Sequence, residues 1–167
     1  YLGEEVTISE HMFQTAELAE EAGASEELIV AALLHDIGHF TNEFPDNAAE
    51  LGIDSHHDWA GAAVLAPFFP KLVTDCVRHH VSAKRYLCTA DPEYYAKLSD
   101  ASVLSLKLQG GPMSENAAKK FSENADIDAI VQVRKWDDEG KVPGKKTPNF
   151  AHYAPMLQRV VDRAAQE

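Results

Sequence analysis

Apolar residues recur at helical spacing through most of this 167-residue chain, without the two-residue alternation and hairpin turns that indicate strands. Thr7–Glu10 has the pattern of a capping box and predicts a first helix that continues to Ala22. Gly23 occupies a position at which helices commonly end, and Ser25 is the expected N-cap of a second helix. That helix contains the apolar run Leu28–Leu34, so we expect it to be buried.

Caps and helix breakers divide the remainder of the chain. The segment 41–54 is rich in Pro, Asn and Gly and is typical of a loop, and Lys141–Thr147 is expected to be a second, basic loop. Further helices are expected from Ser55 to about Ala66, from Pro70 to about Val81, from Asp91 to about Leu108, from caps at Ser114 and Asp126 with the second ending near Gly140, and from Asn149 to about Ala165. The pattern predicts one all-α domain over residues 1–167, with seven or eight helices.

The segment His35-Asp36-Ile37-Gly38-His39 follows directly after the buried apolar run. A buried imidazole beside a buried carboxylate costs free energy unless another group pairs with them. A metal ion is a common partner, because neutral imidazole and ionised carboxylate are both good ligands. The alternative is that His35 and Asp36 bond to each other or cap the helix, and the dipeptide alone leaves both interpretations open.

Other histidines and an aspartate fall on separate predicted helices, which is how metal sites in helical bundles are built. They are His11, His57, His80 and Asp137.

Charge and composition exclude several classes of function. The net charge of −12 argues against a nucleic-acid partner, and no apolar run approaches the roughly 18 residues of a membrane span. Cys76 and Cys88 form no CxxC pair, and we expect reduced thiols in a cytoplasmic protein.

The arrangement of these residues resembles the HD-domain superfamily, whose minimal pattern is a His, a His-Asp pair and a distant Asp. Here the pattern is formed by His11, His35-Asp36 and Asp137, and the resemblance implies an HD-domain helical bundle. Two added histidines mark the dinuclear members, and His57 and His80 fill those places.

The residues around these ligands are similar to one branch, the mixed-valence diiron oxygenases that cleave organophosphonates, which are related to myo-inositol oxygenase. The resemblance extends from Tyr1 to about Asp138. The segments that carry it are Tyr1–Glu4, His35–His39, His80–Lys84, Leu98–Met113 and Arg134–Asp137.

The resemblance implies two irons, Fe(II) and Fe(III), with Asp36 bridging them and O2 as co-substrate. His11, His35 and Asp137 would complete one iron site, and His57 and His80 the other. His56 and His79 are adjacent alternatives. The spacing from His57 to Gly61-Ala62 and from His80 to Lys84 matches the family pattern, and it favours His57 and His80 as the ligands.

Substrate contacts are also implied by the resemblance. His39, Lys84 and Arg134 are the expected catalytic residues, and all three, with Ser102 and Gln109, are expected to contact a phosphonate substrate. Without the resemblance, Lys84 and Arg134 would be read as solvated surface charges. The remaining two expected contacts lie near the first residue: Tyr1, which in the similar enzymes can ligate an iron until substrate binds, and Glu4, which would lie near the substrate amino group.

The implied activity is an iron- and O2-dependent dioxygenase. It would cleave the C–P bond of a 1-hydroxy-2-aminoethylphosphonate or its N-trimethyl analogue, releasing phosphate with glycine or glycine betaine. The alternative is a dinuclear HD phosphohydrolase with the same six ligands. A degenerate HD domain that serves as a sensor is a third interpretation, but it would be expected to lack ligands, and none is missing.

Overall fold

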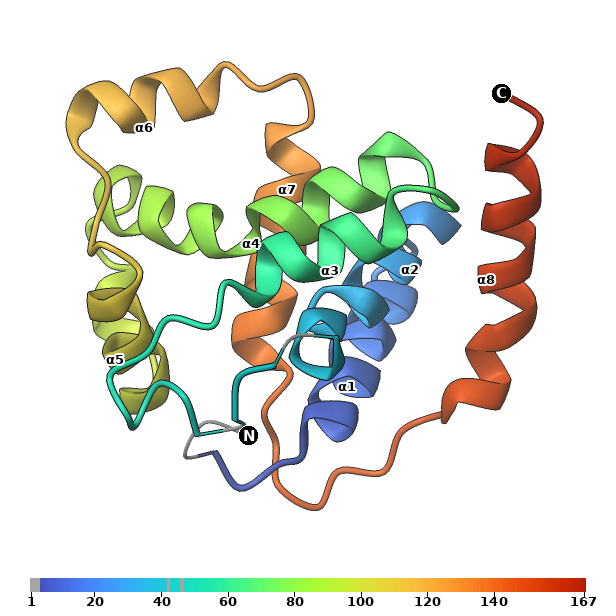
Figure 1. The fold of residues 1–167 in the computed structure, drawn as a ribbon, viewed down its shortest axis with the longest axis horizontal. Helices are drawn as coiled ribbons and strands as arrows, with labels where there is room; N and C mark the ends of the chain where they lie inside the picture. The colour runs from blue at the N-terminus through green and yellow to red at the C-terminus, as the bar shows by residue number, and fades with distance from the viewer. Residues whose placement is uncertain (1–3, 42, 46) are drawn as a thin grey trace.

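The computed structural model describes residues 4–41, 43–45 and 47–167, and within these ranges the chain is helical with no strand (Figure 1). This confirms the predicted all-α fold class. None of the helices that it describes is both long and apolar enough to cross a membrane. The elements in chain order are α1 (Ile8–Glu21), α2 (Glu26–Leu34), the 3₁₀ helix η1 (Ile37–Phe40), α3 (His57–Leu65), α4 (Lys71–Ala90), the 3₁₀ helix η2 (Tyr95–Lys97), α5 (Asp100–Leu108), α6 (Glu115–Ser122), α7 (Ile127–Glu139) and α8 (Phe150–Ala164).

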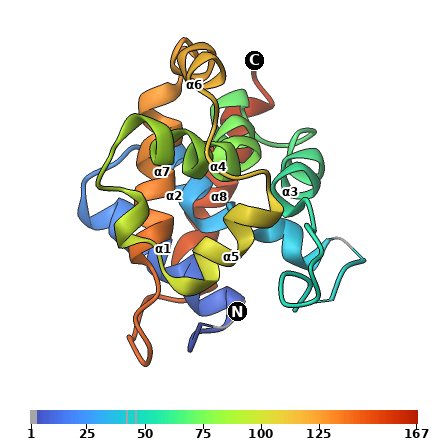
Figure 2. The same ribbon diagram turned by 90° about the vertical axis from the view of Figure 1, so that its left-hand side faces the viewer.

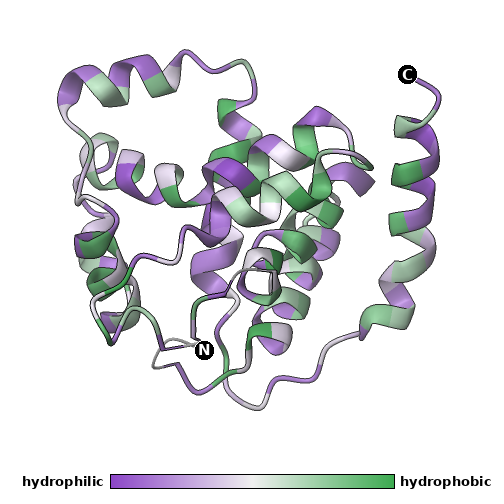
Figure 3. Cartoon of the chain, in the orientation of Figure 1, coloured by the Kyte–Doolittle hydropathy of each residue, from purple (hydrophilic) through white to green (hydrophobic). Residues whose placement is uncertain are grey.

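Helix α2 lies at the centre of the bundle and packs against α1, α4, α7 and α8. Its residues 29–34 are all buried, as the apolar run predicted. Alanines without exposed surface lie on both α1 (Ala16, Ala19) and α2 (Ala31, Ala32), and such small side chains let the two helices approach closely. In Figure 3 the colours show that most residues of α2 are apolar.

Helix α7 packs against α1, α2 and α4, and α3 packs against both α4 and η1. Helices α5 and α6 lie on one side of this group and α8 on the opposite side (Figures 1 and 2). Helix α8 is tied to the ends of α1 and α2 by ion pairs, of which Arg159 and Arg163 to Glu26 are two. The core therefore sits between α1, α2, α4 and α7, and the chemistry-bearing residues project into it.

Two predicted helix boundaries are wrong. Helix α4 continues to Ala90 instead of ending near Val81, because no Pro or Gly interrupts its buried stripe, which continues to Leu87. The Asp91-Pro92 pair does not open a long helix. It leads through a turn and η2 to α5, whose N-cap is Ser99.

The expected start of a helix at Ser55 is also wrong. Helix α3 begins at His57, and its N-cap is His56, which adopts a left-handed conformation with φ of 50°. Asp54 Oδ1 accepts a hydrogen bond from the backbone N–H of His56 at 3.1 Å, so the carboxylate of Asp54 stabilises this turn. The cap expected from Asp126 is not made by its side chain.

Candidate functional site

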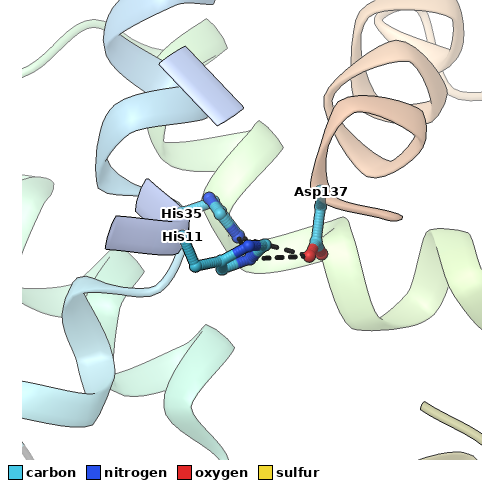
Figure 4. A group of neighbouring side chains, drawn as sticks. All are labelled: His11, His35 and Asp137. Carbon is cyan, nitrogen blue, oxygen red and sulfur yellow. Dashed lines mark hydrogen bonds and ion pairs between the residues drawn. The ribbon is translucent and has the colours of Figure 1, made fainter. Parts of the chain in front are cut away.

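Three of the sequence-predicted ligands meet at the centre of the bundle (Figure 4). His11 comes from α1, His35 from the end of α2 and Asp137 from α7, and all three are buried. The Nε2 atoms of His11 and His35 lie 3.1 Å apart. Asp137 Oδ1 lies 3.0 Å from Nε2 of His11 and 3.5 Å from Nε2 of His35. We call these residues the first ligand set.

His57 and His80 form a second ligand set. His57 is the first residue of α3 and His80 lies in the middle of α4, and their Nε2 atoms are 3.0 Å apart. Both side chains are buried.

Asp36 lies between the two sets and presents one carboxylate oxygen to each. Its Oδ2 is 3.4 Å from His11 Nε2 and 3.3 Å from His35 Nε2. Its Oδ1 is 3.2 Å from His57 Nε2 and 3.3 Å from His80 Nε2. This is the arrangement that a carboxylate bridging two cations requires.

The other ring nitrogen of each histidine faces a protein oxygen. The Nδ1 atoms lie 2.8 Å from the carbonyl oxygen of Gly140 for His11, 2.7 Å from that of Ala32 for His35, 2.6 Å from that of Val77 for His80 and 3.4 Å from Ser55 Oγ for His57. A carbonyl can only accept, so Nδ1 must carry the proton in the first three. Each of these rings can then direct an Nε2 lone pair toward the others, as metal-binding histidines do.

These donors fit a pair of metal ions. The Nε2 lone pairs of the histidines and the carboxylate oxygens of Asp36 and Asp137 converge in a buried space, which favours binding of cations there. Burial opposes a proton on His35, yet Asp36 and Asp137 outweigh it and raise the pKa of His35 to about 10. Burial likewise fails to raise the pKa of Asp36, which stays well below its usual value because of His35 and the other rings. A nitrogen and oxygen set without thiolate suits iron or manganese.

The structure separates each candidate histidine from its neighbour in sequence. The His56 side chain is 68% exposed and points away from the cluster, toward Asp54. His79 is on the side of α4 that meets Phe121, where the two rings pack edge to face. His57 and His80 are the members of each pair that reach Asp36.

His39 borders the second ligand set from η1. Its ring stacks on that of His57 with centroids 4.1 Å apart, and its Nε2 is 3.8 Å from Asp36 Oδ1. Burial, aided by His57, lowers the pKa of His39 to about 3, so this imidazole is neutral at physiological pH.

Gly38 allows η1 to lie directly against the start of α3. A Cβ atom at this position would be only 1.8 Å from the carbonyl oxygen of His57. The glycine of the His35–His39 segment therefore has a packing role, because it brings Asp36 and His39 beside His57.

A pocket opens beside the predicted ligands His57, His80 and Asp137. Its other wall is polar and carries Lys84, Ser102, Ser105, Gln109, Arg134 and Lys141. Four of these six residues were predicted as substrate contacts, whereas Ser105 and Lys141 were not. Gln109 Oε1 is buried and has no hydrogen-bond partner among the described residues, which leaves an acceptor available to a ligand.

The two predicted cations of this pocket are both buried. Lys84 donates to Ser105 Oγ at 2.8 Å, and burial, with Arg134 nearby, lowers the pKa of Lys84 to about 7. Arg134 lies between two carboxylates, with Nη1 2.8 Å from Asp137 Oδ2 and Nε 3.1 Å from Asp138 Oδ1. Arg134 thus holds a predicted metal ligand in place while also lining the pocket.

The two predicted residues near the chain start are only partly described. Glu4 Oε1 lies 4.0 Å from Lys141 Nζ, near the pocket. Tyr1 lies outside the described residues. Lys141 was missed because it opens a segment rich in Lys, Pro and Gly, which was expected to be a solvated basic loop. The one available signal was that it follows Asp137 by four residues, the same spacing that separates Lys84 from His80.

A second pocket adjoins the first and shares His57, Ser105 and Gln109 with it. Its remaining lining is mostly apolar: His39, Pro45, Ala48, Ala49, Ile53, Asp54, Ser55 and Leu108. Pro45, residues 48–55 and the end of α5 thus form a mainly apolar extension beside the second ligand set.

Comparison with known proteins supports the same grouping. A model of the HD domain matches residues 8–119, a stretch that includes five of the six predicted His and Asp ligands but neither Asp137 nor Tyr1. The chain is 53% identical over 163 residues to the 1-hydroxy-2-(trimethylamino)ethylphosphonate dioxygenase (glycine-betaine-forming) of Leisingera caerulea, covering 98% of this chain and 83% of the relative. It is 44% identical over 165 residues to the hydroxymethylphosphonate dioxygenase of Gimesia maris, covering 98% and 82%.

The family model spans well over half of the chain, and both relatives align along nearly its whole length. The observed helical bundle, with His and Asp side chains meeting at its centre, agrees with this match. The chain belongs to the HD-domain family.

Proposed function

We propose that this protein is a diiron dioxygenase that cleaves the C–P bond of 1-hydroxy-2-(trimethylamino)ethylphosphonate. The observation that carries the proposal is Asp36, which stands between two histidine sets beside a pocket with buried cations. The names of the two relatives, both phosphonate dioxygenases, support the reaction class.

The overall reaction balances without an external reductant. The hydroxyphosphonate and O2 give glycine betaine, hydrogen phosphate and a proton, because the substrate carbon supplies the four electrons that O2 accepts. Two irons, held by His11, His35 and Asp137 on one side and by His57 and His80 on the other with Asp36 shared, would supply Lewis acidity and the redox chemistry with O2.

The chain's own residues bind and orient the substrate. The ammonium of Lys84 and the guanidinium of Arg134 attract the phosphonate, and the buried oxygen of Gln109 accepts a hydrogen bond from a hydroxyl group. His39, neutral and stacked on His57, is the nearest group that can accept a proton beside the second ligand set.

The trimethylammonium group is assigned to the apolar extension. A quaternary ammonium cannot donate N–H hydrogen bonds and is usually held by aromatic faces with a carboxylate nearby. The apolar lining of this extension is aliphatic, so it would supply van der Waals contacts to the methyl groups in place of aromatic faces. Ala48, Ala49, Ile53 and Leu108 provide such contacts, and Asp54 supplies the carboxylate. A hydroxymethylphosphonate would leave this extension empty.

The test is phosphate release by anaerobically iron-loaded protein. We expect no phosphate until O2 is admitted, and then one phosphate and one glycine betaine for each O2 consumed. The trimethylated substrate should have a higher kcat/KM than either the primary amine or hydroxymethylphosphonate. Release of phosphate without O2, equally fast with Mn or Mg, would instead establish a hydrolase.

A further inference from the structure

Lys141 is a largely shielded cation of the pocket that none of the motifs predicted. It follows α7 and Gly140, its side chain is only 11% exposed, and its Nζ lies 3.1 Å from Ser102 Oγ. It therefore faces the same pocket as Lys84 and Arg134.

The backbone on both sides of Lys141 is fixed by α1. The carbonyl oxygen of Gly140 lies 2.8 Å from Nδ1 of the ligand His11. Val142 makes two hydrogen bonds with the Gln14 side chain, N–H to Oε1 at 2.9 Å and C=O to Nε2 at 2.8 Å. The position of this lysine is thus set by the helix that also positions the first ligand set, unlike a lysine on a free loop.

The charge of Arg134 is already balanced within the protein. Its guanidinium contacts the carboxylates of both Asp137 and Asp138, so the three groups together carry a negative charge. A phosphonate dianion therefore needs further positive charge on this side of the pocket. Lys84 supplies one ammonium, and its surroundings disfavour that charge until an anion arrives.

The positive charge of Lys141 is less closely paired with carboxylates than that of Arg134. Its nearest carboxylate among the described residues is Glu4, whose Oε1 lies 4.0 Å away, beyond hydrogen-bond distance. The ammonium is instead hydrogen-bonded to a neutral hydroxyl, that of Ser102. Its positive charge is therefore only loosely paired, by Glu4, and can still attract an anion in the pocket.

We propose that Lys141 binds the phosphonate oxygens directly, as a third cation beside Lys84 and Arg134, and that Ser102 holds its ammonium in position. The inference rests on the proposed function, since it assumes a phosphonate in this pocket. It assigns a substrate-binding role to a residue at the end of α7, where the sequence indicated only a solvated basic loop.

The test compares Lys141→Met with Lys145→Met, a lysine of the same loop that pairs with Glu17 instead of the pocket. Iron-loaded protein is titrated anaerobically with 1-hydroxy-2-(trimethylamino)ethylphosphonate by calorimetry. Because one charge-assisted hydrogen bond is lost, we expect Lys141→Met to raise the Kd by about 10-fold to 100-fold. Lys145→Met should leave the Kd within about twofold, because exposed pairs contribute little. Lys141→Arg should restore part of the affinity.

Iron content and melting temperature distinguish binding from structure. Both variants should keep two irons and the wild-type melting temperature. An unchanged Kd in Lys141→Met, or loss of iron in that variant, would overturn the role assigned to Lys141. Neither result would contradict the proposed dioxygenase function. If the wild-type protein binds no phosphonate at all, the proposed function itself fails.

Discussion

At the scale of single residues, the site depends on which of two adjacent histidines faces inward. His57 and His80 reach Asp36, whereas His56 is exposed and His79 meets Phe121. Both members of each pair are histidines, so only their positions along the chain decide which one faces Asp36. This offers two matched comparisons within one chain.

We predict that His57→Ala and His80→Ala each reduce bound iron from two ions per chain to about one or less, since each removes a nitrogen donor. His56→Ala and His79→Ala should retain two. Elemental analysis of anaerobically reconstituted protein measures this directly. Equal loss of iron in both members of a pair would show that the assigned register is incorrect.

Lys84 provides a pH-dependent prediction. Its pKa is lowered to about 7 in the folded protein but is ordinary, near 10.5, when unfolded. Between these values the unfolded chain binds more protons, so the free energy of unfolding rises with pH by up to about 1.4 kcal/mol per unit. Lys84→Met removes this dependence.

Urea unfolding of metal-free protein at several pH values checks the prediction. Lys84→Met should be more stable than wild type near pH 7, and the difference should shrink toward zero as the pH approaches 10.5. A difference that stays constant over this range would mean that Lys84 keeps its ordinary pKa when folded.

At the scale of elements, the close contact between η1 and α3 brings the two ligand sets together. Gly38 permits it, because any side chain there would collide with the backbone of His57. The contact is between backbone atoms, which cannot rotate away as a flexible side chain can.

We predict that Gly38→Ala displaces α3, costs at least about 1–3 kcal/mol of stability and lowers iron content. Gly144→Ala is the control. It also replaces a glycine, at φ of 72°, but its Cβ would meet nothing within 4 Å, so only a backbone cost of about 1–2 kcal/mol is expected. Full iron content in Gly38→Ala would contradict the packing role.

Arg134 shows how one helix serves both the centre and the pocket. It contacts Asp137 three residues later and Asp138 four residues later, and Tyr94 donates a hydrogen bond to Asp138 from outside α7. Helical spacing brings the guanidinium of Arg134 beside the predicted ligand Asp137. The hydrogen bond from Tyr94 to Asp138 instead joins two segments that are far apart in the sequence.

At the scale of the whole molecule, the predicted ligands join α1, α2, α3, α4 and α7 at one point. Metal bound there stabilises the folded chain only, because the unfolded chain does not keep the ligands together. The proposed metal centre thus also acts as a structural link between these helices.

We predict that removing iron with a chelator lowers the melting temperature by about 5–10 °C, and that adding Fe(II) anaerobically restores it. Differential scanning calorimetry measures the change. His80→Ala should lose most of this response and His79→Ala should keep it. A melting temperature that does not respond to iron would argue against binding at the centre of the bundle.

The expected cytoplasmic location remains a prediction.

The sequence by itself determined the fold class and predicted the chemistry of the site. Caps and apolar spacing predicted helices, and the resemblance to HD domains named six candidate ligands, whose side chains the tertiary structure brings together. These features are predictable because they depend on local spacing and residue type. Its errors were at boundaries such as the end of α4, where a buried stripe extends a helix beyond any local signal.

Only the tertiary structure decided which surroundings each residue has. It set one oxygen of Asp36 toward each histidine set, brought Tyr94 to Asp138 beside Arg134, and brought Lys141 into the pocket beside Ser102. Ser102 and Lys141 lie on different elements, and a contact of that kind is made by packing. No local pattern records such a contact, because its free energy depends on burial and neighbours that exist only in the folded chain.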